Sequence, residues 1–118
     1  MLALGGDIDR ASRLQKSGQA MWRLHGIEPE ALDYRKMEVV SGGYQLRPEI
    51  VESAYYLHHY TRDPRWRAMG REFFDDFVRH ARTDAGYAAI RDVRTMERRD
   101  AMESFLFAET FKYYWLLF

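Results

Sequence analysis

Helical periodicity is clearest in residues 63–81, which read DPRWRAMGREFFDDFVRHA. The dipeptide Asp63–Pro64 ends the preceding helix and begins this one. Apolar residues then recur at spacings of three and four, which is typical of an amphipathic helix. This apolar stripe consists of Trp66, Met69, Gly70, Phe73, Phe74, Phe77, Val78 and Ala81. We expect the helix to bury Phe73 and Phe77 between its neighbours.

Three further helices are predicted around this stretch. Asp7 is a plausible N-cap for a helix that ends at Gly26, and its stripe consists of Ile8, Ala11, Leu14, Gly18, Met21 and Trp22. A second helix begins near Pro48 and ends at Asp63, with Val51, Ala54, Tyr55 and His58 on one side. Residues 101–118 are apolar almost all round, a pattern typical of a helix that is buried on every side.

Long connections separate the helices, over residues 27–46 and 83–100. The second contains a possible strand pair, residues 87–90 with 93–95. Long loops in a small helical unit tend to be functional. Paired helices with loops at one end indicate an all-α fold, an α/α hairpin array or toroid with one short β-hairpin-like loop. A four-helix bundle is the alternative, although it favours shorter connections.

Composition limits the function classes. The 118 residues suffice for one domain at most, and Lys+Arg and Asp+Glu both number 18. This balance predicts neither a nucleic-acid partner nor membrane contact. The absence of cysteine excludes disulfides, zinc thiolates and a thiol nucleophile. Both ends are apolar, at residues 1–4 and 115–118, so we expect residues 1–118 to be part of a domain that is truncated at both ends. The last helix should then leave apolar area exposed.

The first candidate site is the octet LRPEIVES, residues 46–53. Pro48 fits the first position of the second helix. Glu49 and Glu52 are three residues apart and share a face, while Arg47 lies just outside and can hold one of them ionised. The alternative is that both glutamates only complement the positive end of the helix dipole.

The second candidate site lies on the last predicted helix. Phe105 and Glu109 are four residues apart on one face, and Met102 and Lys112 continue the row. A carboxylate on an apolar helix needs a partner. One interpretation is an ion pair, for example with Lys112. The other is a site in which Phe105 offers a flat apolar face to a sugar ring and Glu109 accepts hydrogen bonds from sugar hydroxyls or from water around a metal.

These two segments resemble a known family. Residues 44–57, YQLRPEIVESAYYL, resemble the "LRPE…ES" segment of class I α-1,2-mannosidases, glycoside hydrolase family 47. Residues 102–113, MESFLFAETFKY, resemble the "MESF…AET.KY" helix of that family. Residues 61–64 and 86–94 fit the same frame in order. The stretch GYAAIRDVR, residues 86–94, is most similar to the ER degradation-enhancing mannosidase-like branch.

The resemblance implies an (α/α)7 barrel with calcium at its base, which releases terminal α-1,2-mannose from N-glycans with inversion. It implies that Glu49 is the catalytic carboxylate, acting as general base. Arg47 and Glu52 then line the −1 subsite, and Phe105 lies under the sugar ring. Glu109 is implied to bind in the water shell of calcium, an ion that prefers oxygen ligands and often keeps water.

The resemblance also implies partners and missing parts. The expected substrate is a high-mannose N-glycan or glycoprotein, and the missing parts of the same barrel are expected neighbours. In the family, the general acid and a further aspartate lie before Met1, and a calcium-binding threonine lies after Phe118. The chain alone is therefore expected to be inactive. The implied compartment is the endoplasmic reticulum or secretory pathway in a eukaryote, and the periplasm or exterior in a bacterium.

Two other interpretations stay open at this point. The same aromatic and acidic rows could serve a non-catalytic glycan-binding or helical interaction module. The chain could also belong to a different α/α-toroid enzyme that acts on sugars.

Overall fold

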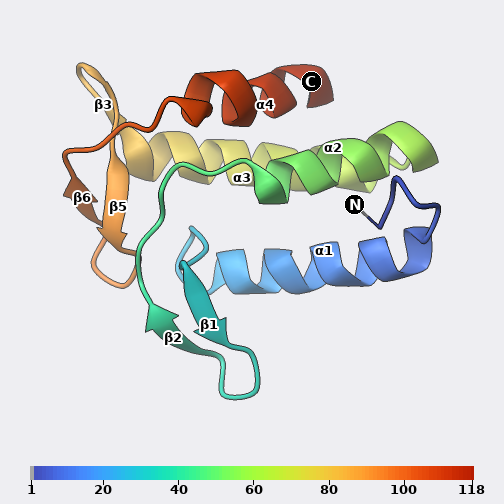
Figure 1. Ribbon diagram of the computed structural model, residues 1–118, viewed down its shortest axis with the longest axis horizontal. Helices are drawn as coiled ribbons and strands as arrows, with labels where there is room; N and C mark the ends of the chain where they lie inside the picture. Colours follow the sequence, from blue (N-terminus) through green and yellow to red (C-terminus); the bar gives the residue numbers. More distant parts are fainter. Residues whose placement is uncertain (1) are drawn as a thin grey trace.

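The structure is a computed structural model that describes residues 2–118. Its helices are α1 (Ile8–Arg23), α2 (Glu49–Thr61), α3 (Pro64–Ala81), the π-helix η1 (Leu106–Phe111) and α4 (Lys112–Leu117). Three antiparallel strand pairs connect them: β1 (Ala31–Asp33) with β2 (Glu38–Ser41), β3 (Arg82–Thr83) with β4 (Gly86–Tyr87), and β5 (Ala89–Asp92) with β6 (Glu97–Arg99). Figure 1 shows α1 and α4 on opposite sides of the α2–α3 pair. The prediction of a mostly helical chain with paired helices is confirmed.

The predicted helix starts are confirmed for α1 and α3. The Asp7 carboxylate accepts a hydrogen bond from the backbone N–H of Arg10 at 3.2 Å. Asp63 caps α3 in the same way, because its Oδ1 accepts from the N–H of Arg65 at 2.9 Å and Pro64 follows at the first helical position. Both caps satisfy N–H groups that the helix leaves without a partner. Arg62, with φ +56°, turns the chain between α2 and α3.

The core confirms the stripe of α3 and corrects that of α1. Phe73 and Phe77 are fully buried, and the Trp22 ring packs against Phe73 with 4.8 Å between centroids. Leu14 was expected in the core but is 65% exposed. Gln15 is buried in its place, because its amide Nε2 donates to the Ile50 carbonyl of α2 at 2.9 Å. As a result, Gln15 rather than Leu14 lies on the inner face of α1.

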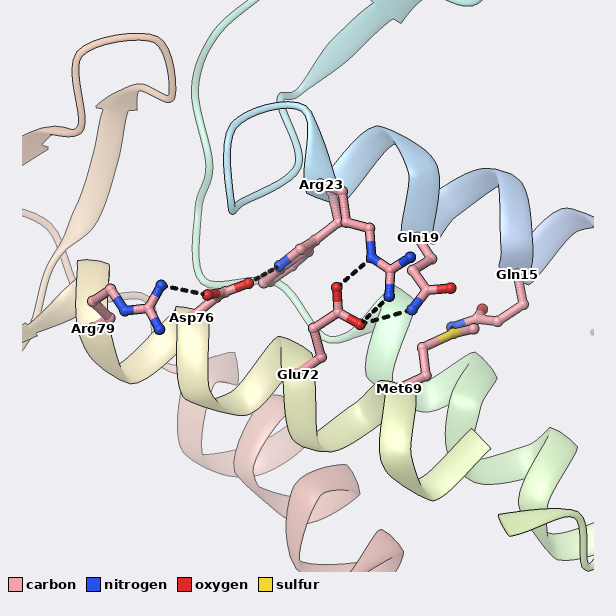
Figure 2. Close-up of polar contacts among 8 residues, drawn as sticks. Gln15, Gln19, Arg23, Met69, Glu72, Asp76 and Arg79 are labelled. Carbon is pink, nitrogen blue, oxygen red and sulfur yellow. Dashed lines mark hydrogen bonds and ion pairs between the residues drawn. The ribbon is translucent and has the colours of Figure 1, made fainter. Parts of the chain in front are cut away.

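Polar side chains join α1 to α3 beside this core (Figure 2). The Trp22 indole N–H donates to Asp76 Oδ2 at 3.1 Å. One helical turn before Asp76, the Glu72 carboxylate accepts from Gln19 Nε2 at 2.7 Å and from Arg23 at 2.8 Å. The interface therefore combines ring packing with charge-assisted hydrogen bonds.

The two long connections contain more strand than expected. The first connection contains the β1–β2 hairpin, residues 31–41, which no pattern predicted. In the second connection, β5 pairs with residues 97–99 rather than 93–95, because the Asp92 carbonyl accepts from the N–H of Met96 at 2.8 Å and makes 93–96 a turn. Tyr44 and Ile90 exchange two backbone hydrogen bonds of 2.9 Å and so join the two connections.

The last helix differs most from its prediction. Ala101 is not helical, because its carbonyl accepts from the Ala89 N–H at 2.8 Å and so continues the β5 region. Met102 therefore lies before the helix and does not continue the row of Phe105 and Glu109. The helix is also not buried on every side. Its buried residues are Leu106, Thr110, Tyr113, Tyr114 and Leu117, whereas Phe107, Trp115, Leu116 and Phe118 are exposed, as expected for the chain taken by itself.

No helix within residues 2–118 is both long enough and apolar enough to cross a membrane.

Candidate active site

The start of α2 holds the first group of candidate residues. The helix begins at Glu49, so Pro48 is its N-cap rather than its first residue, and the Pro48 carbonyl accepts from the Glu52 N–H at 2.8 Å. Leu46, two residues earlier, is buried with φ +60°. Such a backbone costs a bulky residue about 1–3 kcal/mol and is kept only where its surroundings fix it. The Thr110 hydroxyl of η1 helps, since it donates to the Leu46 carbonyl at 2.6 Å.

Arg47 does not pair with the glutamates of its own helix, which corrects the prediction. Its guanidinium forms an ion pair with Glu30, in the segment that leads into β1. The Tyr44 hydroxyl donates to the Arg47 carbonyl at 3.3 Å, and the guanidinium carbon lies 5.9 Å from the centre of the Tyr44 ring. Arg47 is therefore held toward the β1–β2 hairpin, by a partner that the octet does not contain.

Glu52 is held by a residue of the second motif. The Tyr113 hydroxyl of α4 donates to Glu52 Oε1 at 2.7 Å. The pKa of Tyr113 is raised far above its usual value, first by burial and then by this hydrogen bond to Glu52. The hydroxyl thus stays protonated and remains a donor. This contact joins the octet of residues 46–53 to the segment 102–113.

In this structure Glu109 has a partner on the last helix, as the first of its two interpretations expected. Its carboxylate forms an ion pair with Lys112, whose Nζ lies 4.4 Å from the centre of the Tyr113 ring. Phe105 precedes the first residue of η1 and is partly exposed. The segment that carries both is a π-helix, a rare conformation that is often found at functional sites.

Glu49 faces two cavities. It is exposed and, among residues 2–118, its carboxylate makes no hydrogen bond or ion pair. The first cavity, of about 340 Å³, is also lined by Gln15, Glu52 and Tyr56. The second, of about 550 Å³, is also lined by Glu28 and by residues of α1 and the β1–β2 hairpin. The structure thus brings Glu49 and Glu52 to one cavity, whereas Arg47, Phe105 and Glu109 line neither.

The calcium prediction has limited support in the donor atoms present. Within residues 2–118, no group of three His, Cys, Asp or Glu side chains could hold a metal ion. The Glu109 carboxylate stands beside an ammonium group, so it fits only a water-mediated contact to an ion whose direct ligands come from elsewhere.

Sequence reasoning missed three residues of this region: Glu28, Glu30 and Tyr113. Glu28 is buried, and burial raises the pKa of its carboxyl to about 7, against a smaller opposite effect of Arg47. Glu28 and Glu30 lie in the predicted connection of residues 27–46, and Tyr113 ends the segment 102–113, in which only Phe105 and Glu109 were assigned to a site. That Glu30 lies beside Arg47 could not be inferred from residues 46–53 alone.

Comparisons with known proteins identify the family of these motifs. The profile of glycosyl hydrolase family 47 matches residues 1–118. The chain belongs to glycosyl hydrolase family 47. Alpha-mannosidase I MNS4 of Arabidopsis thaliana is 42% identical over 117 residues, which are 98% of this chain and 19% of that protein. Human ER degradation-enhancing alpha-mannosidase-like protein 2 is 38% identical over 118 residues, 98% of this chain and 20% of its own length.

A solved structure of the family has the same fold. The α-1,2-mannosidase from Trichoderma reesei is 37% identical, with a TM-score of 0.65, and the match covers 68% of this chain and 17% of that one. The resemblance to family 47 and to its ER degradation-enhancing branch is therefore confirmed, and so is the helical fold class. This family 47 chain spans about a fifth of the length of the curated relatives quoted above.

Proposed function

We propose that the chain is part of a glycosidase that removes terminal α-1,2-linked mannose from N-glycans. Family membership and the names of the relatives support the hydrolysis of mannosides. The relatives linked to ER degradation favour the endoplasmic reticulum or secretory pathway as the compartment. The observation that carries the proposal is Glu49, a carboxylate at a helix start that faces two cavities and has no partner within residues 2–118.

The proposed mechanism is inverting hydrolysis with Glu49 as general base. An ionised carboxylate can take a proton from the attacking water on one face of the sugar, while a general acid protonates the leaving oxygen. Glu52, held by the Tyr113 hydroxyl, accepts from sugar hydroxyls in the smaller cavity. Arg47 and Phe105 are proposed to complete the −1 subsite.

The general acid is proposed to lie before Met1, as the family resemblance implies, so residues 1–118 alone should not turn over substrate. This expectation rests on the family resemblance and on the need for two carboxyl groups in such hydrolysis.

Calcium remains part of the proposal as an ion near Glu109. The ion would supply a positive charge that binds sugar hydroxyls, and Glu109 would hold water of its coordination shell. Because outer-shell partners typically contribute tenfold to a hundredfold in metal affinity, Glu109→Gln should weaken calcium binding. Added calcium should then partly restore activity, which calcium titration of both proteins would measure.

The deciding experiment is Glu49→Gln in the longest natural protein that carries these residues. The amide keeps shape and hydrogen bonding but cannot act as a base. We expect α-1,2-mannobiose still to bind, with kcat at least about a hundredfold lower, since general bases contribute about 10²–10⁴. Glu38→Gln, an exposed glutamate of β2, is the control and should keep normal kcat.

Two results would contradict the proposal. Normal turnover by the Glu49→Gln protein would remove Glu49 from the mechanism. Glycan binding without any hydrolysis by the unmodified protein would favour the alternative, a non-catalytic glycan-binding module.

A further inference from the structure

Among the described residues, two arginines near the end of α3 have no carboxylate partner. Most arginines of the chain form ion pairs, as Arg79 does with Asp76 at 3.0 Å. Arg82 of β3 and Arg98 of β6 are exposed and form no ion pair within residues 2–118. Figure 1 shows β3 and β6 at the same end of the helix array, beside the end of α3. Such arginines can bind an anion, because the N–H donors of a guanidinium match carboxylate and phosphate oxygens.

Both arginines line one hollow of the surface. The hollow, of about 590 Å³, is lined by Val78, Arg82, Thr83, Asp84 and Arg98. All of these side chains except Val78 are polar, whereas the two cavities at Glu49 have mostly apolar walls. Among residues 2–118, the hollow shares no lining residue with either of those cavities. It is therefore a separate candidate site, with a different chemistry.

One of the two guanidinium groups is held in place by the backbone. Arg98 Nε donates to the His80 carbonyl at 2.8 Å, in the last turn of α3. Its two terminal nitrogens make no hydrogen bond to other described residues. A guanidinium that is fixed at one nitrogen loses less freedom when the other two bind a ligand. Arg98 is thus prepared to contact an anion through its outer edge.

The charges around the hollow favour an anion. Arg82 and Arg98 contribute two positive charges, and Asp84 is the single carboxylate in the wall. Behind the hollow, burial lowers the pKa of His80, and Arg79 and Arg98 lower it further against the opposite effect of Asp76. The lowering by the two arginines shows that their positive charge is felt at this end of α3. An excess of positive charge in a hollow attracts anions from solution.

The set of polar groups suits a phosphate group that is carried by a sugar. A phosphate monoester has close to two negative charges near pH 7 and three acceptor oxygens, which arginines bind in pairs. The Asp84 carboxylate repels phosphate, but it can accept hydrogen bonds from sugar hydroxyls. The Thr83 hydroxyl can serve either part of such a ligand. Bare phosphate would leave Asp84 as an unfavourable neighbour.

We propose that this hollow binds a phosphorylated sugar, with Arg82 and Arg98 on the phosphate and Asp84 accepting from the sugar hydroxyls. Binding here needs no hydrolysis and does not involve Glu49. The choice of mannose as the sugar rests on the proposed function, whereas the phosphate contacts do not depend on it. The ligand can be a free sugar phosphate or a phosphorylated sugar residue of a glycan, because the recognised groups are the same.

The test is isothermal titration calorimetry on the longest natural protein that carries these residues. We expect mannose 6-phosphate to bind at least about tenfold more tightly than inorganic phosphate, because Asp84 gains hydrogen bonds only from the sugar. Arg82→Gln should weaken mannose 6-phosphate binding at least about tenfold, the usual effect of losing a charge-assisted hydrogen bond. Arg82 makes no ion pair within residues 2–118, so this variant should keep the fold. Arg13→Gln, an exposed arginine of α1, is the matched control and should bind normally.

Asp84→Ala separates the two parts of the ligand. Loss of the carboxylate removes a repulsion, so inorganic phosphate should bind more tightly than to the unmodified protein. The preference for mannose 6-phosphate over inorganic phosphate should disappear, since the acceptor for the sugar hydroxyls is gone. An unchanged preference would contradict the role of Asp84.

A blocked ligand distinguishes the two sources. Methyl 6-phospho-α-D-mannoside carries a substituent on C1, as a sugar residue of a glycan does. Affinity equal to that of mannose 6-phosphate would support a phosphorylated glycan residue as the ligand. Affinity at least about tenfold lower would support a free sugar phosphate, because the C1 hydroxyl is then one of the recognised groups.

Three results would overturn the inference. The unmodified protein could fail to bind mannose 6-phosphate, or it could bind inorganic phosphate equally well. Arg82→Gln could also bind as the unmodified protein does, or lose no more affinity than Arg13→Gln.

Hydrolysis of α-1,2-mannobiose separates the inference from the proposed function. Arg82→Gln should keep normal kcat and KM, because the hollow lies apart from the cavities at Glu49. If the unmodified protein does not hydrolyse the disaccharide but shows Arg82-dependent binding of mannose 6-phosphate, the glycosidase proposal fails and the phosphate site stands. If hydrolysis is present and mannose 6-phosphate does not bind, the inference alone fails.

Discussion

Two faces of the helix array differ in how their polar groups are satisfied. Between α1 and α3, Gln19, Arg23 and Trp22 find their partners on one neighbouring helix (Figure 2). At the start of α2, Glu49 has no partner among the described residues, and Leu46, just before the helix, has a strained backbone. Proteins keep such local conflicts mainly at functional sites. The first face therefore maintains the fold, and the second is the place for chemistry.

The largest expected effect lies in the core beside the first face. Phe73→Ala removes a fully buried ring that packs against Trp22, so it should lower the free energy of unfolding by about 3–5 kcal/mol. The matched control is Phe107→Ala on η1, where the ring is 60% exposed and the loss should stay below about 1 kcal/mol. Chemical denaturation measures both. Equal losses would show that the two faces do not differ as described.

The strained turn of the second face depends on Thr110. Thr110→Val removes the hydroxyl that bonds the Leu46 carbonyl and leaves a buried acceptor without a partner. We expect a loss of about 1–2 kcal/mol in unfolding free energy, with a lower kcat because Arg47 and Glu49 follow this turn. Thr110→Ser keeps the hydroxyl and should restore most of both quantities. If valine is tolerated and serine is not, methyl packing rather than the hydrogen bond holds the turn.

The two faces also differ in how far the sequence could predict them. The caps and stripes of α1 and α3 are local patterns, so the sequence revealed them with the exception of Leu14, which a long-range bond from Gln15 displaced. The partners at the second face are distant: Glu30 lies 17 residues before Arg47, and Tyr113 lies 61 residues after Glu52.

The predicted start of the last helix was wrong for the same reason. Its late start is set by the backbone bond from Ala89 to Ala101, which joins two segments that no periodicity relates. The motif resemblance identified Glu49 and Glu52 from the sequence alone. The residues around them could be identified only from the folded structure.

A smaller effect is expected from the contact that joins the two motifs. Tyr113→Phe removes the hydroxyl that orients Glu52 and keeps the ring. We expect KM for α-1,2-mannobiose to rise about threefold to tenfold with a smaller change in kcat, which corresponds to a net hydrogen bond of about 1 kcal/mol. Adding Tyr113→Phe to Glu52→Ala should then cost almost nothing, because alanine offers the hydroxyl no acceptor and the tyrosine acts through Glu52. Additive losses in this cycle would contradict that positioning role.

The smallest effect concerns an ion pair of the first face. The hydrogen bond from Arg23 lowers the pKa of Glu72, so its contribution to stability is complete above the unfolded-state pKa, near 4.3, and is lost as pH falls through the folded-state pKa. Because Arg23 is largely exposed, the pair should contribute about 1 kcal/mol or less. Denaturation at pH 7 and pH 3 should show a smaller acid loss in Glu72→Gln than in the unmodified protein. Glu38→Gln, exposed on β2, should leave that loss unchanged; equal acid losses in all three proteins would show that this pair contributes nothing.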